Sequence, residues 1–311
     1  QAEAARLGEG GQLGLPSGIP GLSELVGGFR PATFVVAGGA PGWGKSTLMM
    51  QMADHIADTA VGRGEAGGSH VVSIEMSADQ LVSKTLLGNA GVDSRRIDAG
   101  TATDEELSRV YEALERLRNR RVLIDDLDDP TWPQVRAKII LAKEEHNIEC
   151  AFIDYVQKIR KPPRMERKDH VAEIAAGCKS LAKQLDICIV GMAQLKRPEG
   201  RRRNAAPPKP QMTDLADSAS LERDADMVLL LWPRDAVAPD FRRDGNWARQ
   251  HTTLVVAKNR FGNTGDVPVI FNKSLQLFEP PPEHAEMNWS ATPNYTERES
   301  APVPNSQEII P

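Results

Sequence analysis

The clearest chemical signal in the sequence is a glycine-rich stretch that ends in a lysine and a serine. Residues 39–46 match the pattern G-x-x-x-x-G-K-[ST] and lead into Thr47: Gly39, Ala40, Pro41, Gly42, Trp43, Gly44, Lys45 and Ser46. Glycines let backbone N–H groups turn toward phosphate oxygens, and the start of a following helix adds partial positive charge. We therefore expect a nucleotide site in which Lys45 reaches the β- and γ-phosphates of ATP and the Ser46 hydroxyl binds Mg²⁺. Thr47 belongs to the same expected site.

Three polar side chains follow apolar runs and could complete this chemistry. Asp154 ends AFID, Glu75 ends VSIE and Gln194 ends IVGMAQ. A carboxylate at Asp154 could hold Mg²⁺ through water, and Glu75 could orient the water that attacks the γ-phosphate. The amide of Gln194 could sense whether the γ-phosphate is present. Each residue alone also fits an ordinary solvated strand end, but three of them facing one phosphate loop favour a catalytic site.

These residues need a scaffold that brings strand ends together. Buried strands are predicted at 33–38, 71–75, 122–125, 150–154, 187–192, 227–232 and 254–257, and helices at 45–60, 132–146 and around 171–185. Thr103 and Glu106 form a capping-box pair, and a helix after them would carry Leu107, Val110, Tyr111, Leu114 and Leu117 on one face. Alternating strands and helices predict an α/β fold: a mostly parallel, twisted sheet with helices on both faces and ligands at the carboxyl ends of the strands.

Composition excludes some classes of protein and partner. The 311 residues are 40% apolar and 26% charged, as in an ordinary globular protein, and the net charge of −5 gives no overall basic field. Any nucleic-acid binding must therefore come from local basic segments. Cys150, Cys178 and Cys188 lack metal-ligand spacing and are expected to be buried, inert thiols. Since neither a membrane-spanning run nor a secretory signal is apparent, we expect a cytoplasmic protein without membrane contact.

The chain divides by composition into three parts. Residues 1–14 are polar and glycine-rich and are expected to be a linker remnant, whereas residues 15–279 would form one α/β domain. Residues 280–311 are proline-rich and polar, which predicts a disordered tail. Because the sequence does not begin with Met, we expect it to be a piece of a longer chain.

The order and wording of the motifs resemble the C-terminal motor domain of the DnaB-type replicative DNA helicases of bacteria, phages or plasmids. After the phosphate loop come SIEMS (73–77), IDYVQ (153–157), AQLKR (193–197), DLADSASLERDADMVLLLWPRD (214–235) and AKNRFGNTG (257–265). The resemblance covers about 85% of the chain. It implies a RecA-like P-loop NTPase that hydrolyses ATP, forms a ring (a hexamer in the family) and moves 5′ to 3′ on single-stranded DNA. It assigns Glu75 as catalytic base, Asp154 as the Mg²⁺-linked carboxylate and Gln194 as nucleotide sensor.

Lys258 and Arg260 resemble the pair that one subunit of such a ring inserts into its neighbour's ATP site. An arginine supplied in trans can raise the rate of phosphoryl transfer by about 10³ to 10⁵. Hydrolysis would then depend on a neighbouring subunit. The alternative is a solvated basic strand end.

DNA contacts are expected from loops around 160–168 and 196–213 and from the start of the segment after Asp214. Residues 196–203 carry five basic side chains against one acidic one, and the candidate contacts are Lys196, Arg197, Arg201, Arg202, Arg203, Asp217 and Ala219. The alternative is a solvated charged surface. Where the family commonly shows DLRESG, this chain has Ala216 in place of the basic residue, so binding would rely more on the arginine-rich loop.

Other partners and other functions remain open at this point. A helicase loader is a possible partner, whereas coupling to primase is unsupported because the family's N-terminal domain is not in the sequence. Residues 258–262 (KNRFG) also resemble a RadA-like branch-migration ATPase, which would need a four-cysteine zinc finger that three scattered cysteines cannot make. A small-molecule P-loop kinase and a loader or scaffold that does not unwind DNA are the remaining alternatives.

Overall fold

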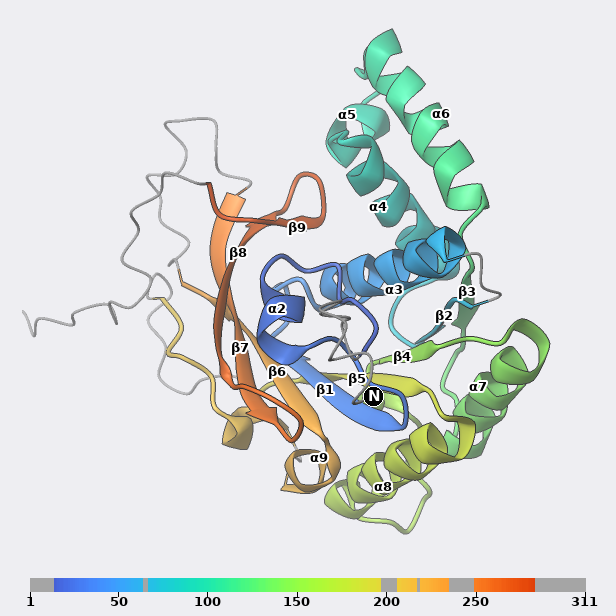
Figure 1. Cartoon of the computed structure of the whole chain (residues 1–311), viewed down its shortest axis with the longest axis vertical. Helices are drawn as coiled ribbons and strands as arrows, with labels where there is room; N and C mark the ends of the chain where they lie inside the picture. Colours follow the sequence, from blue (N-terminus) through green and yellow to red (C-terminus); the bar gives the residue numbers. More distant parts are fainter. Residues whose placement is uncertain (1–13, 64–66, 197–205, 217–218, 235–248, 283–311) are drawn as a thin grey trace, which may run out of the picture. The chain divides into compact units, whose positions relative to one another are not determined.

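The computed structural model describes residues 14–63, 67–196, 206–216, 219–234 and 249–282. Its strands are β1 (Thr33–Gly39), β2 (Ser69–Ser73), β3 (Val122–Asp126), β4 (Cys150–Asp154), β5 (Cys188–Gln194), β6 (Met227–Pro233), β7 (Arg249–Asn259), β8 (Gly265–Asn272) and β9 (Leu277–Glu279). They form one sheet in the order β3-β2-β4-β5-β1-β6-β7-β8-β9 (Figure 1). Pairing is parallel from β3 to β6 and antiparallel from β6 to β9. The predicted α/β class with a mostly parallel sheet is confirmed.

Helices connect the parallel strands, as the alternation in the sequence predicts. Along the described residues they are α2 (Leu22–Val26), α3 (Lys45–Gly62), α4 (Ala78–Ala90), α5 (Ser94–Asp98), α6 (Asp104–Arg118), α7 (Trp132–His146), α8 (Arg167–Leu185) and α9 (Ala219–Asp224), with 3-10 turns η1 (Val156–Lys158) and η2 (Met212–Asp214). The helix predicted at 132–146 and the strand predicted at 150–154 have the predicted bounds.

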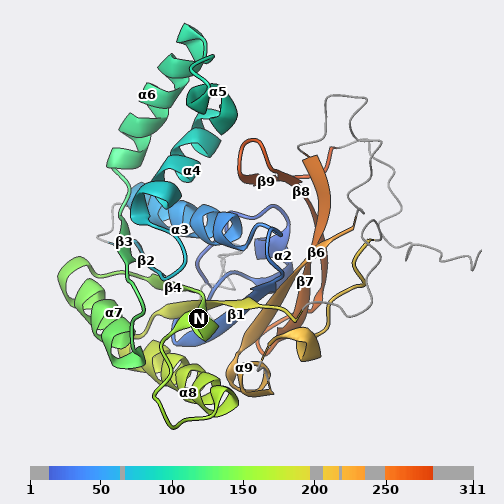
Figure 2. The same ribbon diagram turned by 180° about the vertical axis from the view of Figure 1, so that it is seen from behind.

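Both faces of the parallel strands are buried, which explains their uninterrupted apolar runs. Phe34 and Val36 of β1 point into a core shared with α7 and α8, whereas Val35 and Ala37 point into a second core shared with α3. Figure 1 and Figure 2 show the same arrangement, with α3 on one side of the sheet and α7 and α8 on the other. Burial of each large apolar side chain contributes roughly 1.5–3 kcal/mol, so these two cores hold the strand ends in place.

The antiparallel strands β7, β8 and β9 extend the sheet beyond the predicted part. The sequence predicted only residues 254–257 of β7 as strand, and neither β8 nor β9 was predicted. Pro268 weakens the strand pattern of β8, but β9 pairs only with Ile270–Asn272, so Pro268 lies where β8 has no partner on that side. The proline inside β8 and the three-residue length of β9 both leave little strand signal in a single sequence.

The helices α4, α5 and α6 pack on one another, away from the sheet (Figure 1). The capping box of Thr103 and Glu106 is confirmed at the start of α6. The helix predicted after it is confirmed as α6, but its apolar side chains are largely exposed: Tyr111 is 69% exposed, and Leu107 and Leu114 are exposed too. The cause is the narrow contact of α6 with α4 and α5, which buries Ala113 and part of Val110.

The chain ends, the cysteines and the helices bear on three further predictions from the sequence. Residues 1–13 of the expected linker and 283–311 of the expected tail lie outside the described residues. All three cysteines are free and buried, as predicted, and burial raises the pKa of Cys150 and Cys178, which keeps those thiols protonated. Within the part of the chain that the structure describes, every helix is too short or too polar to cross a membrane.

Candidate active site

The phosphate-loop motif joins β1 to α3 at the carboxyl end of the parallel strands. Gly42 and Gly44 have φ angles of 78° and 91°, a left-handed conformation that glycine adopts without strain. A Cβ on Gly44 would also lie 3.0 Å from the rings of Phe271 and Phe278. The loop therefore needs glycine at this position for two reasons. It delivers the chain into the first turn of α3, whose amide N–H groups have no acceptors within the helix and can bind an anion.

Lys45 is the first residue of α3, and only 8% of it is exposed. Its Nζ lies 3.5 Å from the Ala40 carbonyl oxygen, a long contact that leaves the ammonium weakly held. Burial lowers the pKa of Lys45, while the carboxylates of Asp154 and Glu75 oppose that shift. A buried cation at the N-terminus of a helix is suited to bind an anion such as a phosphate.

Asp154 ends β4, and its carboxylate meets the phosphate loop. The Ser46 hydroxyl donates to Asp154 Oδ2 over 2.7 Å, whereas Oδ1 is buried and has no hydrogen-bond partner among the described residues. Asp154 has 0% exposure, and burial raises its pKa against the opposing effects of Ser46 and Lys45. A hydroxyl beside a carboxylate that has one buried oxygen without a donor offers the oxygen ligands that Mg²⁺ prefers, so these two residues fit that ion.

Glu75 lies near this cluster but not on a strand. The sequence placed it at the end of a strand covering 71–75, and this boundary is wrong because β2 ends at Ser73. There the Ser73 hydroxyl accepts a hydrogen bond from Met76 N–H (3.3 Å), which turns the chain out of the sheet. Glu75 is consequently exposed, yet its charge influences the pKa of both Lys45 and Asp154. An exposed carboxylate this near the loop is able to hold a water molecule.

Gln194 ends β5 directly beside the first glycine of the loop. Gly39 and Gln194 are paired residues of neighbouring parallel strands, and Leu195 N–H donates to Gly39 O over 3.4 Å. Lys45, Ser46, Asp154 and Gln194 thus come from separate segments to one end of the sheet, as predicted for parallel strands.

Gln157 is a buried polar residue at the same end for which the sequence analysis proposed no role. Its Oε1 accepts from Gln194 N–H at 3.2 Å, and its Nε2 donates to Gln194 O at 3.4 Å and to Ala216 O at 3.2 Å. The available signal was its place three residues after Asp154 within the motif IDYVQ.

Lys258 and Arg260 lie at the opposite end of the parallel strands. Asn259 pairs with Met227, which pairs with Val35, four residues before Gly39 along β1. At about 3.3 Å per residue, this places the pair roughly 13 Å or more from the phosphate loop of the same chain. Lys258 Nζ donates to Glu222 O (2.6 Å) and Arg260 to Arg223 O (2.9 Å), both at the C-terminal end of α9. The structure does not bring these two residues to the site of their own chain.

Most of the candidate DNA-contact residues lie outside the part of the chain that the structure describes. Arg197, Arg201, Arg202, Arg203 and Asp217 lie outside the described residues. Lys196 is exposed just after β5, and its backbone N–H donates to Asp214 O over 2.7 Å. Ala219 is exposed as the first residue of α9.

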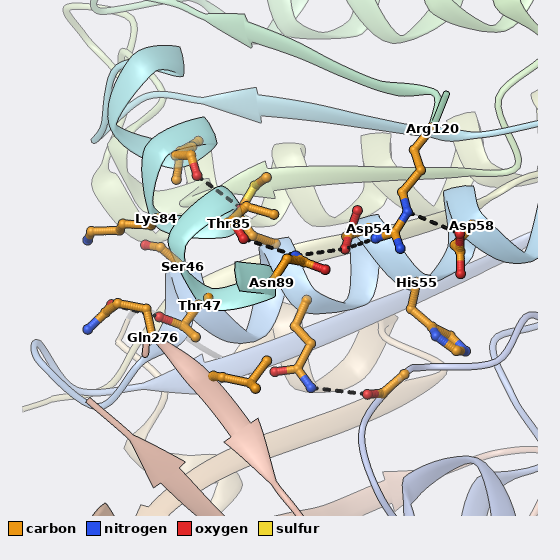
Figure 3. A pocket seen from close by; sticks show the side chains of 16 residues that line it. Ser46, Thr47, Asp54, His55, Asp58, Lys84, Thr85, Asn89, Arg120 and Gln276 are labelled. Carbon is orange, nitrogen blue, oxygen red and sulfur yellow. Dashed lines mark hydrogen bonds and ion pairs between the residues drawn. The ribbon is translucent and has the colours of Figure 1, made fainter. Parts of the chain in front are cut away.

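A polar cavity of about 220 Å³ starts beside Ser46 and Thr47 and follows α3 toward its C-terminal half (Figure 3). At its far end Arg120 pairs with Asp54 and, over 3.0 Å, with Asp58. No sequence motif indicates this cavity, because most of the residues that line it are spread over α3, α4 and the turn before β9.

Residues 14–280 match the family described as DnaB-like helicase C terminal domain. The replicative DNA helicase DnaB of Geobacillus stearothermophilus is 29% identical over 272 residues, which cover 87% of this chain and 57% of that protein. DnaB of Leifsonia xyli subsp. xyli is 30% identical over 280 residues, which cover 89% of this chain and 58% of that protein. The chain thus spans less than two thirds of the length of these relatives.

Two solved structures show the same fold. One, an isolated ATPase domain, aligns with a TM-score of 0.74 and 21% identity, covering 90% of this chain and 96% of that one. A DnaB-like replicative helicase, described with its interactions with primase, aligns with a TM-score of 0.76 and 22% identity over 90% of this chain and 65% of that one. At these identities the likeness establishes a shared RecA-like architecture.

Proposed function

The chain belongs to the DnaB-like helicase C-terminal domain family, and on that premise we propose that it is the ATP-driven motor of a replicative DNA helicase. In this proposal the protein forms a ring, with six subunits as the family resemblance implies, and moves along single-stranded DNA to unwind duplex. One observation carries the proposal: the glycine-rich loop motif and the cationic pair Lys258 and Arg260 lie at opposite ends of one sheet. Such a subunit can be completed by the next copy.

ATP would bind with its phosphates in the loop at 39–46. The ammonium of Lys45 would contact the β- and γ-phosphates, and the amides of the first turn of α3, including that of Thr47, would donate to phosphate oxygens. Mg²⁺, held by Ser46 and by Asp154 through water, would neutralise the charge that develops on the phosphates. The buried Asp154 Oδ1, which has no partner among the described residues, supports this arrangement.

Glu75 would orient and deprotonate the attacking water. Its exposure leaves room for solvent, and its influence on the pKa of Lys45 and of Asp154 supports a position near the phosphate loop. Gln194, beside Gly39, would respond to the γ-phosphate with its side-chain amide. Both roles are carried over from the family resemblance and agree with the positions of the residues.

Lys258 and Arg260 would act on the ATP bound by the neighbouring subunit. Their distance from the phosphate loop of their own chain supports a role in trans. Arg260 is held by Asp226, whose Oδ1 accepts from its guanidinium over 3.3 Å, and by the carbonyl of Arg223. A held guanidinium loses less conformational freedom when it meets a phosphate, which favours transition-state stabilisation.

Single-stranded DNA is the proposed track, and its phosphates would be contacted by the arginine-rich loop that follows Lys196. Because the net charge is −5, this local cluster has to supply the attraction. A helicase loader remains a possible partner, whereas the described residues give no ground for proposing contact with primase.

The test is ATP turnover with and without single-stranded DNA, combined with strand displacement on a forked duplex. A motor should hydrolyse ATP faster on DNA and should release the annealed strand only when ATP is hydrolysed. Turnover that ignores DNA and depends on a small-molecule acceptor would identify a kinase. Turnover on DNA without strand displacement would favour a loader, and preference for branched joints over forks would favour a branch-migration ATPase.

A further inference from the structure

The carboxamide of Gln157 is the junction of three segments at the carboxyl end of the sheet. Gln157 is 5% exposed and lies in η1, immediately after β4 and Asp154. Its side chain bonds both backbone groups of Gln194 and also the carbonyl of Ala216. Only a side chain that both donates and accepts can make this set of bonds.

Residues 214–216 are hydrogen-bonded to the end of β5 and to the residues that follow it. Ala216 N–H donates to Gln194 O over 3.0 Å, and Leu195 and Leu215 form a β-bridge. Lys196 N–H donates to Asp214 O over 2.7 Å. These bonds join residues 194–196 to residues 214–216, and Gln157 is bonded to both, so a displacement of Gln194 along β5 would act on residues 214–216.

From Ala216 the chain continues to α9, which is hydrogen-bonded to the two residues proposed to act in trans. Two residues separate Ala216 from α9, and the last carbonyls of α9 accept hydrogen bonds from Lys258 and Arg260. One end of this path lies at the phosphate loop, and the other lies at the opposite end of the sheet. The segment also lies between the arginine-rich loop and α9 in the sequence.

We propose that Gln157 is a positioning residue that couples the nucleotide state read by Gln194 to residues 211–216, and through α9 to Lys258 and Arg260, so that single-stranded DNA stimulates ATP turnover. The inference rests on the proposed motor function. Gln157 itself touches neither phosphate nor DNA in this scheme. Its loss should therefore leave ATP binding and turnover without DNA in place while it removes the response to DNA.

Gln51 offers a matched control, because its carboxamide makes an equivalent clamp elsewhere. Its Oε1 accepts from Phe278 N–H at 2.8 Å, and its Nε2 donates to Phe278 O at 3.0 Å and to Gly18 O at 3.1 Å. Each glutamine thus holds both backbone groups of one residue and one further carbonyl. Gln51 clamps β9 to α3, which is not on the path from Gln194 to α9.

The experiment compares Gln157→Met with Gln51→Met in the whole chain. ATP affinity, turnover without DNA and turnover at saturating single-stranded DNA are measured for both variants and the parent. We expect Gln157→Met to lower the stimulation by DNA about 5-fold or more, with ATP affinity and DNA-free turnover within about twofold of the parent. Gln51→Met should keep the stimulation. Equal stimulation in Gln157→Met and the parent would overturn the proposal.

Two further results distinguish failure of this proposal from a folding defect and from failure of the proposed motor function. If Gln157→Met does not fold, Gln157→Glu keeps the length and the bond from Gln194 N–H but loses at least one of the two donated bonds, because a carboxyl group carries at most one proton, so its stimulation should also fall. Full stimulation in folded Gln157→Glu would then overturn the proposal. A parent protein that DNA does not stimulate would instead overturn the motor function, and the inference with it.

Discussion

Asp154 and Asp226 are both buried carboxylates, but they lie at opposite ends of the parallel strands and are satisfied to different degrees. Asp226 accepts from Phe34 N–H (2.9 Å), from Lys179 Nζ (2.5 Å) and from the guanidinium of Arg260 (3.3 Å). Asp154 accepts from Ser46, and its other oxygen has no partner among the described residues.

The difference separates two uses of a buried charge. At the amino end of the parallel strands both oxygens of Asp226 are paired, so Asp226 stabilises the fold and holds Arg260 in place. At the carboxyl end the desolvated Asp154 oxygen is a cost to the protein alone, and a bound cation would relieve it. In the proposed ring each end would hold part of an ATP site, and the carboxyl end of one copy would meet the amino end of the next.

The largest effect is expected from Lys45→Ala at the carboxyl end. The ammonium is the main protein charge available to the β- and γ-phosphates, so ATP turnover should fall on the order of 10³-fold or more. Steady-state phosphate release by the purified variant measures this loss. Turnover near that of the parent would remove the assignment of the phosphate loop.

At the amino end, Arg260→Ala should leave ATP binding intact while turnover falls by about 10³-fold, because only the neighbour's transition state loses a charge. Mixing these subunits with Lys45→Ala subunits should restore part of the activity. In a mixed ring an intact phosphate loop on one subunit can face an intact Arg260 on the other. Neither uniform ring contains that pairing.

Tandem-linked subunits of defined order sharpen this comparison of the two ends. A linked pair that carries Lys45→Ala in one half and Arg260→Ala in the other should form rings with some productive interfaces. If such rings form and are as inactive as either parent variant, the role in trans loses its main support. Arg260→Ala protein with full turnover would remove that role altogether.

The substitution Glu75→Gln tests the exposed acidic residue near the carboxyl end of the parallel strands. Because Glu75 is proposed to orient and deprotonate water, turnover should fall about 10² to 10⁴-fold while ATP affinity is retained. Equilibrium titration with a fluorescent ATP analogue, beside steady-state turnover, separates the two quantities. Asp79→Asn, which changes another exposed acid in the first turn of α4, is the matched control. A matched loss of affinity and rate in Glu75→Gln would indicate a structural residue.

The sequence predicted the carboxyl end better than the amino end, and the reason is physical. Asp154 and Gln194 each follow a buried strand of a parallel sheet, so the fold class alone brings them together. Glu75 was misplaced by two residues because the turn at Ser73 depends on a side-chain hydrogen bond that apolar periodicity does not encode. Gln157 was missed because its role comes from contacts with Gln194 and Ala216, which are distant in sequence.

The same contrast holds for the fold. Strands buried on both faces, such as β1 and β4, leave continuous apolar runs and were found with nearly correct bounds. The antiparallel strands β8 and β9 and the six-residue helix α9 carry weaker patterns and were not predicted. The links among Asp226, Lys179 and Arg260 are likewise tertiary, so the amino end could be recognised only by resemblance.

A smaller effect is expected from the arginine-rich loop that follows the carboxyl end. Replacing Arg201, Arg202 and Arg203 with Ala should weaken binding of single-stranded DNA and reduce the slope of log affinity against log salt. Each lost phosphate contact changes that slope by roughly 0.7. Arg109, Arg116 and Arg118 of the exposed α6 surface provide a control with the same loss of charge. Fluorescence anisotropy over a salt series measures both variants, and an unchanged slope would leave the loop as solvated surface.

The last prediction concerns the stability of the two aspartate variants, measured in chelator and without nucleotide. Asp226→Asn should lower the free energy of unfolding by about 3 kcal/mol or more, because Lys179 and Arg260 lose a buried counter-charge. Asp154→Asn should leave it unchanged or raise it by about 1 kcal/mol, since a neutral amide costs less to bury than an ionised carboxylate and still accepts from Ser46. Denaturant unfolding monitored by circular dichroism gives both values.

The pH dependence of that difference tests its cause. Burial raises the pKa of Asp154 above its ordinary value of 3.8, so the folded chain binds this proton more tightly than the unfolded chain does. The contribution of Asp154 to stability is therefore fully present below 3.8 and is lost as the pH rises through the raised pKa. The stability of Asp154→Asn relative to the parent should increase over that window and then level off, and added Mg²⁺ with an ATP analogue should reverse the order. If Asp154→Asn instead costs as much as Asp226→Asn at neutral pH, then Asp154 is a structural residue like Asp226, and the two ends of the sheet do not differ in the way proposed.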